Sequence, residues 1–130
     1  MGRRQNGQQV HGWLNLDKPF GLSSSRAVSR VQRAFDAKKA GHGGTLDPLA
    51  TGILPIAFGE ATKTAAYAMD GIKTYNFGIR WGEARSTDDC EGEVIETYDH
   101  RPTEKQIESA LTAFVGAIEQ VPPRYSAVKI

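Results

Sequence analysis

A twelve-residue segment, residues 41–52, constrains the fold more than any other part of this chain of 130 residues. It reads Gly41-His42-Gly43-Gly44-Thr45-Leu46-Asp47-Pro48-Leu49-Ala50-Thr51-Gly52. Glycine adopts backbone conformations that a Cβ forbids and lets a ligand come close, while Pro48 disfavours the helical conformation at Asp47. The segment therefore predicts a rigid, uncrowded loop that presents Asp47 for chemistry. The alternative is a turn or capping aspartate, a common role for Asp before Pro.

Charge is distributed unevenly along the chain. The composition, 39% hydrophobic and 24% charged, suffices for one domain with a core. Residues 1–63 hold nine Lys and Arg against four Asp and Glu, whereas residues 64–130 hold seven against eleven. A basic half beside an acidic half predicts a face that binds a polyanion. A solvated charged surface is the alternative.

Cysteine content and hydropathy narrow the class of protein. Cys90 is the only cysteine, which excludes an intrachain disulfide and a cysteine-based zinc site. Residues 1–9 are polar and lack the apolar centre of a secretory signal, and no apolar run reaches the length of a membrane span. We therefore expect a cytoplasmic protein without membrane contact.

The first half of the chain predicts a strand, a helix and a second strand. Residues 12–17 read as a short strand, and Ser23–Ser25 can cap the helix that follows. That helix places Val28, Val31 and Phe35 on one face and Arg26, Arg30 and Arg33 on another. Residues 53–58 form an apolar strand in which Pro55 indicates an edge or irregular position. Residues 1–11, which precede the first strand, are expected to be a flexible basic tail.

The second half continues this mixed pattern. We expect a short helix over 59–69, a strand over 74–81, whose apolar residues alternate, a polar loop over 82–92 and a returning strand over 93–98. A capping box at Thr103 begins a helix that would bury Ile107, Leu111, Phe114 and Val115, and a last strand begins at Ser126. The order predicts an α+β domain over 12–130, with a mixed, largely antiparallel sheet and flanking helices.

Several common site motifs do not fit. No Gly-Lys-Ser/Thr follows the spaced glycines, which excludes a phosphate-binding P-loop, and the dinucleotide pattern and the serine nucleophile elbow also fail. Thr87 and Tyr98 occupy positions where a calcium loop needs acidic ligands. The three histidines lack a paired metal spacing. No metal is therefore expected.

Five ordered motifs resemble the bacterial TruB pseudouridine synthases over nearly the whole chain. They are residues 16–24 (Leu-Asp-Lys-Pro with Gly21 and Ser23-Ser24), 42–52 (His-Gly-Gly-Thr-Leu-Asp-Pro with Gly52), 59–63 (Gly-Glu-Ala-Thr-Lys), 73–75 (Lys-Thr-Tyr) and 122–129. The resemblance implies that uridine 55 in the T-loop of tRNA is converted to pseudouridine: the base is detached from C1′, rotated and rejoined through C5. It implies no cofactor, the tRNA T-arm as partner and no obligate protein partner.

The same resemblance implies roles for individual residues. Asp47 would be the essential carboxylate, Tyr75 would stack on the flipped base, and His42 would contact the RNA and help to hold the nucleotide out of its loop. Lys18 would give structural or electrostatic support. Basic residues expected around the catalytic loop would contact RNA phosphates: Arg26, Arg30, Arg33, Lys38, Lys39 and Lys63. Core packing for Tyr75 and a backbone-bonded turn for His42 are the alternatives.

Family members continue well beyond Ile130, into the rest of the catalytic domain and a C-terminal RNA-binding domain. The resemblance implies that a basic residue pairing with Asp47 lies in that remainder, so we expect the 130 residues alone to be inactive or nearly so, with a sheet edge open to self-association. Two other functions stay open. One is a non-catalytic RNA-binding or chaperone module, and the other is a carboxylate-based hydrolase with Asp17 or Glu60 as second acid.

Overall fold

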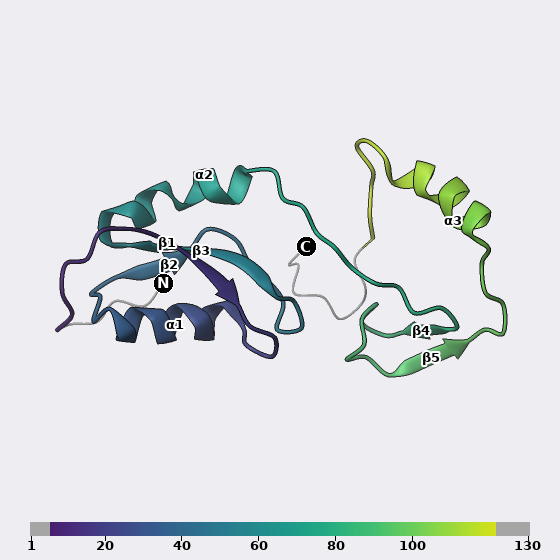
Figure 1. Cartoon of the computed structure of the whole chain (residues 1–130), viewed down its shortest axis with the longest axis horizontal. Coiled ribbons are helices and arrows are strands. Elements are labelled where there is room, and N and C mark those ends of the chain that lie inside the picture. Colours follow the sequence, from purple (N-terminus) through teal and green to yellow (C-terminus); the bar gives the residue numbers. More distant parts are fainter. Residues whose placement is uncertain (1–5, 122–130) are drawn as a thin grey trace. The chain divides into compact units, whose positions relative to one another are not determined.

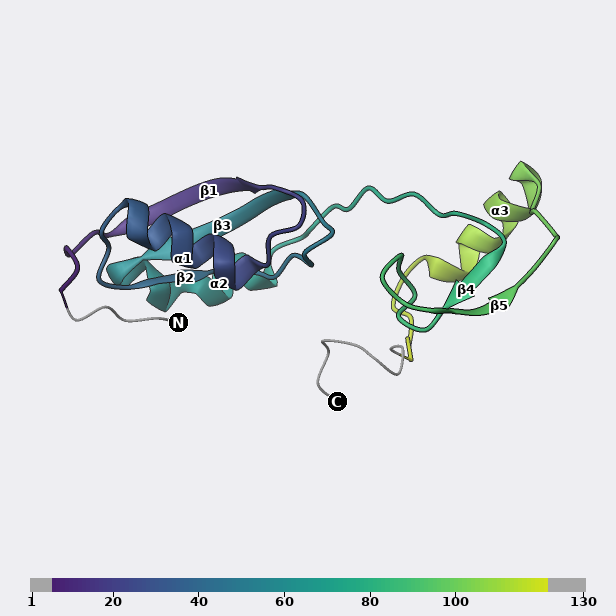
Figure 2. The ribbon, with the colours of Figure 1, turned by 90° about the horizontal axis from the view of Figure 1, so that it is seen from below.

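The computed structural model describes residues 6–121 and divides into two compact units, Met1–Thr74 and Tyr75–Ile130, each described here by itself. In the first unit, β1 (Gly12–Lys18), β3 (Gly52–Phe58) and β2 (Ala40–His42) form an antiparallel sheet in the order β1-β3-β2. Figures 1 and 2 show this sheet between α1 (Ser24–Ala34) on one face and η1 (Gly59–Thr64) with α2 (Ala65–Asp70) on the other.

Alternation along the strands builds the core between the sheet and α1. Leu54, Ile56 and Phe58 of β3 are buried and pack with Ala27 and Val28 of α1. Helix α1 begins as predicted, because the Ser23 side chain accepts a hydrogen bond from the Arg26 N–H. The last residue of its predicted apolar face, Phe35, remains 48% exposed, with its ring centroid 5.3 Å from that of Phe58.

Pro55 lies in the central strand of the sheet, so of the two expected positions, edge or irregular, the edge was wrong. Its carbonyl oxygen accepts a hydrogen bond of 2.9 Å from the Gly43 N–H, on the β2 side. The proline nitrogen faces the same side, since the N–H and C=O of one residue point to the same side of a strand. Because β2 ends at His42, the missing N–H removes one ladder bond at the point where pairing stops.

Part of the expected N-terminal tail lies against the first unit. Gln8 forms an isolated bridge with Ala37, its N–H donates to the Asp36 carbonyl (2.6 Å), and its carbonyl accepts from the Lys38 N–H (2.8 Å). Gly7 also packs closely, because a Cβ there would lie 2.6 Å from the Lys38 nitrogen. Residues 6–11 therefore form one wall of the first unit.

The second unit holds a hairpin of β4 (Glu83–Arg85) and β5 (Val94–Thr97), followed by α3 (Glu104–Leu111) and η2 (Thr112–Phe114). The predicted capping box is present at Thr103 and Gln106. The strand expected over 74–81 was wrong: residues 72–80 are exposed and form no strand, and β4 arises inside the expected polar loop. An alternating segment becomes a strand only where a neighbour pairs with it, and here β5 pairs with 83–85.

The apolar side of α3 and η2 is not covered as predicted. Leu111, Phe114 and Val115 are 57%, 64% and 78% exposed, and Ile107 is half-buried. The last predicted strand, from Ser126, lies outside the described residues. Antiparallel sheets with flanking helices confirm the α+β class. No helix within residues 6–121 has the length and apolar character needed to cross a membrane.

Candidate active site

Asp47 lies in the loop between β2 and β3, at one end of the sheet, and its side chain is exposed. The Asp47 carbonyl accepts a hydrogen bond of 3.0 Å from the Ala50 N–H, which closes a turn over Pro48 and Leu49. Gly43, at the start of the loop, is tied to Pro55 of β3. The segment thus forms a loop with a tight turn after Asp47, whose side chain is exposed.

Ser24 holds the residue immediately before Asp47. Its hydroxyl donates to the Leu46 carbonyl oxygen and accepts from the Leu46 N–H, with both distances 2.9 Å. Ser24 is buried and is the first residue of α1, so the position of the helix determines the position of Leu46. One side chain thus satisfies both backbone polar groups of Leu46, as a neighbouring strand does in a β-ladder.

Lys18 and Gly21 hold the residue immediately after Asp47. The Lys18 side chain is fully buried, and its ammonium group donates to the carbonyls of Leu22 (2.6 Å), Pro19 (3.0 Å) and Pro48 (3.4 Å). The Gly21 N–H donates to the same Pro48 carbonyl at 2.8 Å. An ammonium group without solvent needs such acceptors, because burying a charge unpaired is costly.

These contacts fix the backbone on both sides of Asp47 and leave its carboxylate open to solvent. Neighbours held by partly buried hydrogen bonds reduce the conformations that the loop must lose when a substrate binds. A carboxylate presented in this way can act as a nucleophile, a general base or an electrostatic partner without rearrangement of its loop. The site is therefore preorganised for chemistry at one carboxylate.

His42 is the last residue of β2 and stands at the same end of the sheet as the loop. It pairs with Ile56, which places its half-buried ring on the core side of the sheet. Its Nδ1 atom is buried and has no hydrogen-bond partner within residues 6–121. The alternative, a turn histidine bonded to nearby backbone, is therefore not found at Nδ1 among residues 6–121.

Gly43 is needed for the packing of α2 under the loop. A Cβ at Gly43 would lie 2.6 Å from the Ala68 Cβ and 3.4 Å from the Trp13 ring. Gly44 has φ +145°, and a Cβ there would come within 3.9 Å of the Lys73 side chain. The glycines thus bring the loop, α2 and the start of the 73–75 motif close together.

The expected basic residues do not all surround the loop. Arg26, Arg30 and Arg33 are exposed along α1, which begins beside the loop at Ser24. Lys38, Lys39 and Lys63 lie toward the opposite end of the sheet, so for these three the expected position was wrong. The reason is the register, since residue 40 pairs with residue 58, whereas the loop joins the other ends of β2 and β3.

Tyr75 and Glu60 are the remaining predicted residues. Tyr75 is the first residue of the second unit and is 60% exposed, so within that unit it is not a core residue. Glu60, one of the two acids considered for a hydrolase, follows Phe58 and Gly59 at the sheet end away from the loop and pairs with Lys63 at 2.5 Å. Glu60 is therefore not a second acid beside Asp47.

Sequence reasoning did not find the roles of Ser24 and Gly21 as contacts of the loop. Both belong to the 16–24 motif, but the sequence indicates only a helix cap for Ser24 and no contact for Gly21. The signal in the sequence was that a single amphipathic helix separates the 16–24 motif from the 42–52 motif, which allows the two motifs to meet. No group of three or more His, Cys, Asp or Glu side chains in the described part of the chain could hold a metal ion.

Comparison with known proteins bears directly on this site. The family model described as TruB family pseudouridylate synthase (N terminal domain) matches residues 32–130. The tRNA pseudouridine synthase B of Rhodospirillum rubrum is 61% identical over all 130 residues, and that of Gluconacetobacter diazotrophicus is 63% identical over 128 residues, or 98% of the chain. In both comparisons, the chain spans 42% of the relative's length.

A solved structure agrees with the fold. The crystal structure of a Cbf5-Nop10-Gar1 complex includes a chain with a TM-score of 0.61 and 30% identity, aligned over 92% of this chain and 31% of that one. The matched family model includes the loop that carries Asp47 and covers most of the chain. The chain belongs to the TruB family of pseudouridylate synthases.

Proposed function

We propose that this chain supplies the catalytic carboxylate for the conversion of uridine 55 in the T-loop of tRNA to pseudouridine. The observation that carries the proposal is the exposed Asp47 between two residues, Leu46 and Pro48, that buried side chains hold in place. The identity with two enzymes named tRNA pseudouridine synthase B supports tRNA as the substrate. The reaction would take place in the cytoplasm, with no cofactor and no obligate protein partner.

In this reaction the C1′–N1 bond breaks, the base rotates and a C1′–C5 bond forms. The C5 proton leaves, and N1 takes up a proton. An ionised Asp47 would act at the sugar or the base, and the fixed loop would hold it there while the detached base turns. Because uridine 55 lies within a folded loop of tRNA, it must be flipped out before Asp47 can reach it.

Three other residues would assist the reaction. His42 would contact the RNA through the accessible part of its half-buried ring, since its Nδ1 atom is buried. Lys18 would act through the Pro48 carbonyl and not by touching RNA, since its ammonium group is buried among backbone carbonyls. Tyr75, largely exposed in the second unit, would stack on the flipped base.

The test uses a chimera in which this chain replaces the matching part of the Rhodospirillum rubrum tRNA pseudouridine synthase B. T-arm RNA labelled with tritium at C5 of uridine reports the reaction, because C5 loses its hydrogen when the new bond forms. Release by the chimera and none by its Asp47→Asn variant is expected. RNA binding without release by either protein would instead favour the non-catalytic RNA-binding module.

A further inference from the structure

A cavity of about 310 Å³ lies at the end of the first unit opposite the Asp47 loop. Its lining comprises residues 8–11, Lys38, Lys39, Gly59 and Glu60; we call it the distal cavity. Strand β1 starts beside it at Gly12 and ends at Lys18 beside the loop. Seven residues of extended chain place the two sites roughly 20 Å apart. The distal cavity is therefore separate from the proposed catalytic site.

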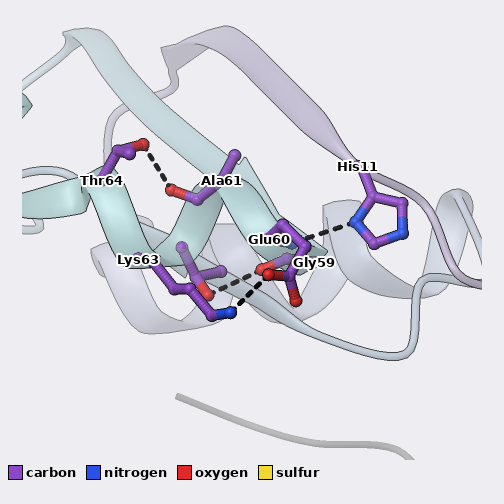
Figure 3. A network of polar contacts seen from close by, with 7 residues as sticks. His11, Gly59, Glu60, Ala61, Lys63 and Thr64 are labelled. Carbon is purple, nitrogen blue, oxygen red and sulfur yellow. Dashed lines mark hydrogen bonds and ion pairs between the residues drawn. The ribbon is translucent and has the colours of Figure 1, made fainter.

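The walls of the distal cavity are formed by hydrogen-bonded backbone. Lys38 N–H donates to the Gln8 carbonyl (2.8 Å), and Gly59 N–H donates to the Lys39 carbonyl (3.0 Å). Figure 3 shows the third contact, in which the Glu60 N–H donates to Nδ1 of His11 at 3.0 Å. A Cβ at Gly59 would lie 2.4 Å from that same Nδ1 atom, so the two segments meet closely.

The ionisable side chains at the distal cavity carry more positive than negative charge. Lys38 and Lys39 are half-buried and line the cavity. The hydrogen bond and charge of Lys63 lower the pKa of the Glu60 carboxyl, and His11 and Lys39 add to this effect. Glu60 is thus ionised at neutral pH, and this one carboxylate faces Lys63, Lys38 and Lys39, so positive charge is in excess.

The remaining donors suit an anion with several oxygen atoms. When Nδ1 of His11 accepts a hydrogen bond, the proton of the neutral ring is on Nε2, which can donate. The amide side chains of Gln8 and Gln9 and the two ammonium groups add further donors at the same lining. Phosphate oxygens are the acceptors that such donors bind most strongly, through charge-assisted hydrogen bonds.

We propose that the distal cavity binds a phosphate group of the RNA backbone, away from the nucleotide that reacts; this inference rests on the proposed function. Helix α1 connects the two sites, because it begins at Ser24 beside the loop and is followed by Ala37, whose N–H donates to Gln32. Exposed basic residues follow the same path: Arg26, Arg30 and Arg33. An RNA held at Asp47 would find cations along this path, ending at the distal cavity.

The first test compares RNA binding by three proteins: the chimera, its double variant Lys38→Gln/Lys39→Gln, and its single variant Lys105→Gln. Lys105 is exposed on α3 and serves as the control. Affinity for T-arm RNA is measured at several salt concentrations. Loss of one or two phosphate contacts lowers the slope of log affinity against log salt by roughly one to two units. We expect that change in the double variant and none in the control. An unchanged slope, or an equal change in the control, would overturn the proposal.

A second pair of variants removes a carboxylate instead. Glu60→Gln and Glu83→Gln each remove the carboxylate partner of one basic side chain, exposed Lys63 or half-buried Arg85, so they match in charge. We expect Glu60→Gln to tighten RNA binding several-fold and Glu83→Gln to have little effect. Equal effects would contradict a phosphate at the distal cavity, because they would report net charge alone.

A third measurement distinguishes binding of RNA from binding of small anions at the distal cavity. Backbone amide NMR signals of Lys38, Lys39 and Glu60 in the 130-residue chain are followed during titration with T-arm RNA and with inorganic phosphate. Shifts with RNA at far lower concentration than with phosphate support the proposal, and shifts with phosphate alone overturn it. If the chimera releases no tritium while the salt slope still falls in the double variant, the proposed function fails and the phosphate site stands.

Discussion

The Ser24 hydroxyl forms two hydrogen bonds with a single residue, Leu46, donating to its carbonyl and accepting from its N–H at 2.9 Å each. The two residues are 22 positions apart in the sequence, and Leu46 directly precedes Asp47. The first turn of α1 is thereby joined to the loop that carries the proposed catalytic carboxylate. A disturbance of this one side chain should reach Asp47 through one peptide unit.

Ser24→Ala should release the Leu46 peptide. Two polar groups lose their partner in a partly buried position, at a cost of about 1–3 kcal/mol in the free energy of unfolding. Amide hydrogen exchange of Leu46 in the 130-residue chain should become faster, and urea denaturation should show the loss of stability. Ser25→Ala is the matched control, since Ser25 is exposed. Unchanged exchange at Leu46 in Ser24→Ala would contradict the described role.

Lys18→Met should weaken the other side of the loop. Methionine keeps most of the volume of the side chain but removes the ammonium donor from the carbonyls of Leu22, Pro19 and Pro48, of which Pro48 retains the Gly21 N–H. Hydrogen bonds to charged groups contribute about 1.5–3 kcal/mol, and we expect a loss of stability in that range. Lys105→Met on α3 should change stability by less than about 0.5 kcal/mol. A Lys18→Met protein as stable as the wild type would show that the ammonium group is dispensable.

Local signals in the sequence predicted most individual elements. The Ser23 cap marked α1, the capping box at Thr103 marked α3, and apolar runs marked β1 and β3. These signals act within one or two turns or between neighbouring positions in a strand, so they can be read from adjacent residues. The Asp47 loop was predicted from its glycines and Pro48 for the same reason.

Contacts between distant segments could not be predicted in this way. Strand β2 has three residues, two of them in the Gly-rich segment 41–52, and exists because β3 pairs with it. The apolar alternation over 74–81 predicted a strand, but no described segment pairs with it. The Ser24–Leu46 and Lys18–Pro48 hydrogen bonds likewise depend on how β1, α1 and the loop pack in three dimensions.

Gly43→Ala tests the close approach of α2 to the start of the loop. The new methyl group would lie 2.6 Å from the Ala68 Cβ, so one of the two segments must move. Overpacking of this kind costs about 1–3 kcal/mol. Ala68→Gly removes the opposing methyl group, and the double variant should therefore lose less stability than the sum of the single variants. Additive losses in denaturation experiments would show that the two positions do not meet.

The Glu60–Lys63 pair predicts a defined pH dependence. The hydrogen bond and charge of Lys63 hold the pKa of Glu60 below its ordinary value of 4.5. The stabilising contribution of Glu60 is therefore present above pH 4.5 and is lost as the pH falls through the lower pKa of the folded state. Carboxyl NMR titration should give a midpoint below 4.5 that rises in Lys63→Met and not in Lys105→Met. A wild-type midpoint at or above 4.5 would contradict the pair.

The most direct test of the preorganised loop is the single-turnover rate of pseudouridine formation by the chimera with Asp47→Glu. Glutamate keeps the charge but moves the carboxylate outward by about 1.5 Å, the length of one C–C bond. Because a displacement of about 1 Å can reduce a rate on the order of 100-fold, we expect Asp47→Glu to bind T-arm RNA normally and to react at about 1% of the wild-type rate or less. A rate within a few-fold of the wild type would contradict the account, because the position that the loop imposes on Asp47 would then not matter.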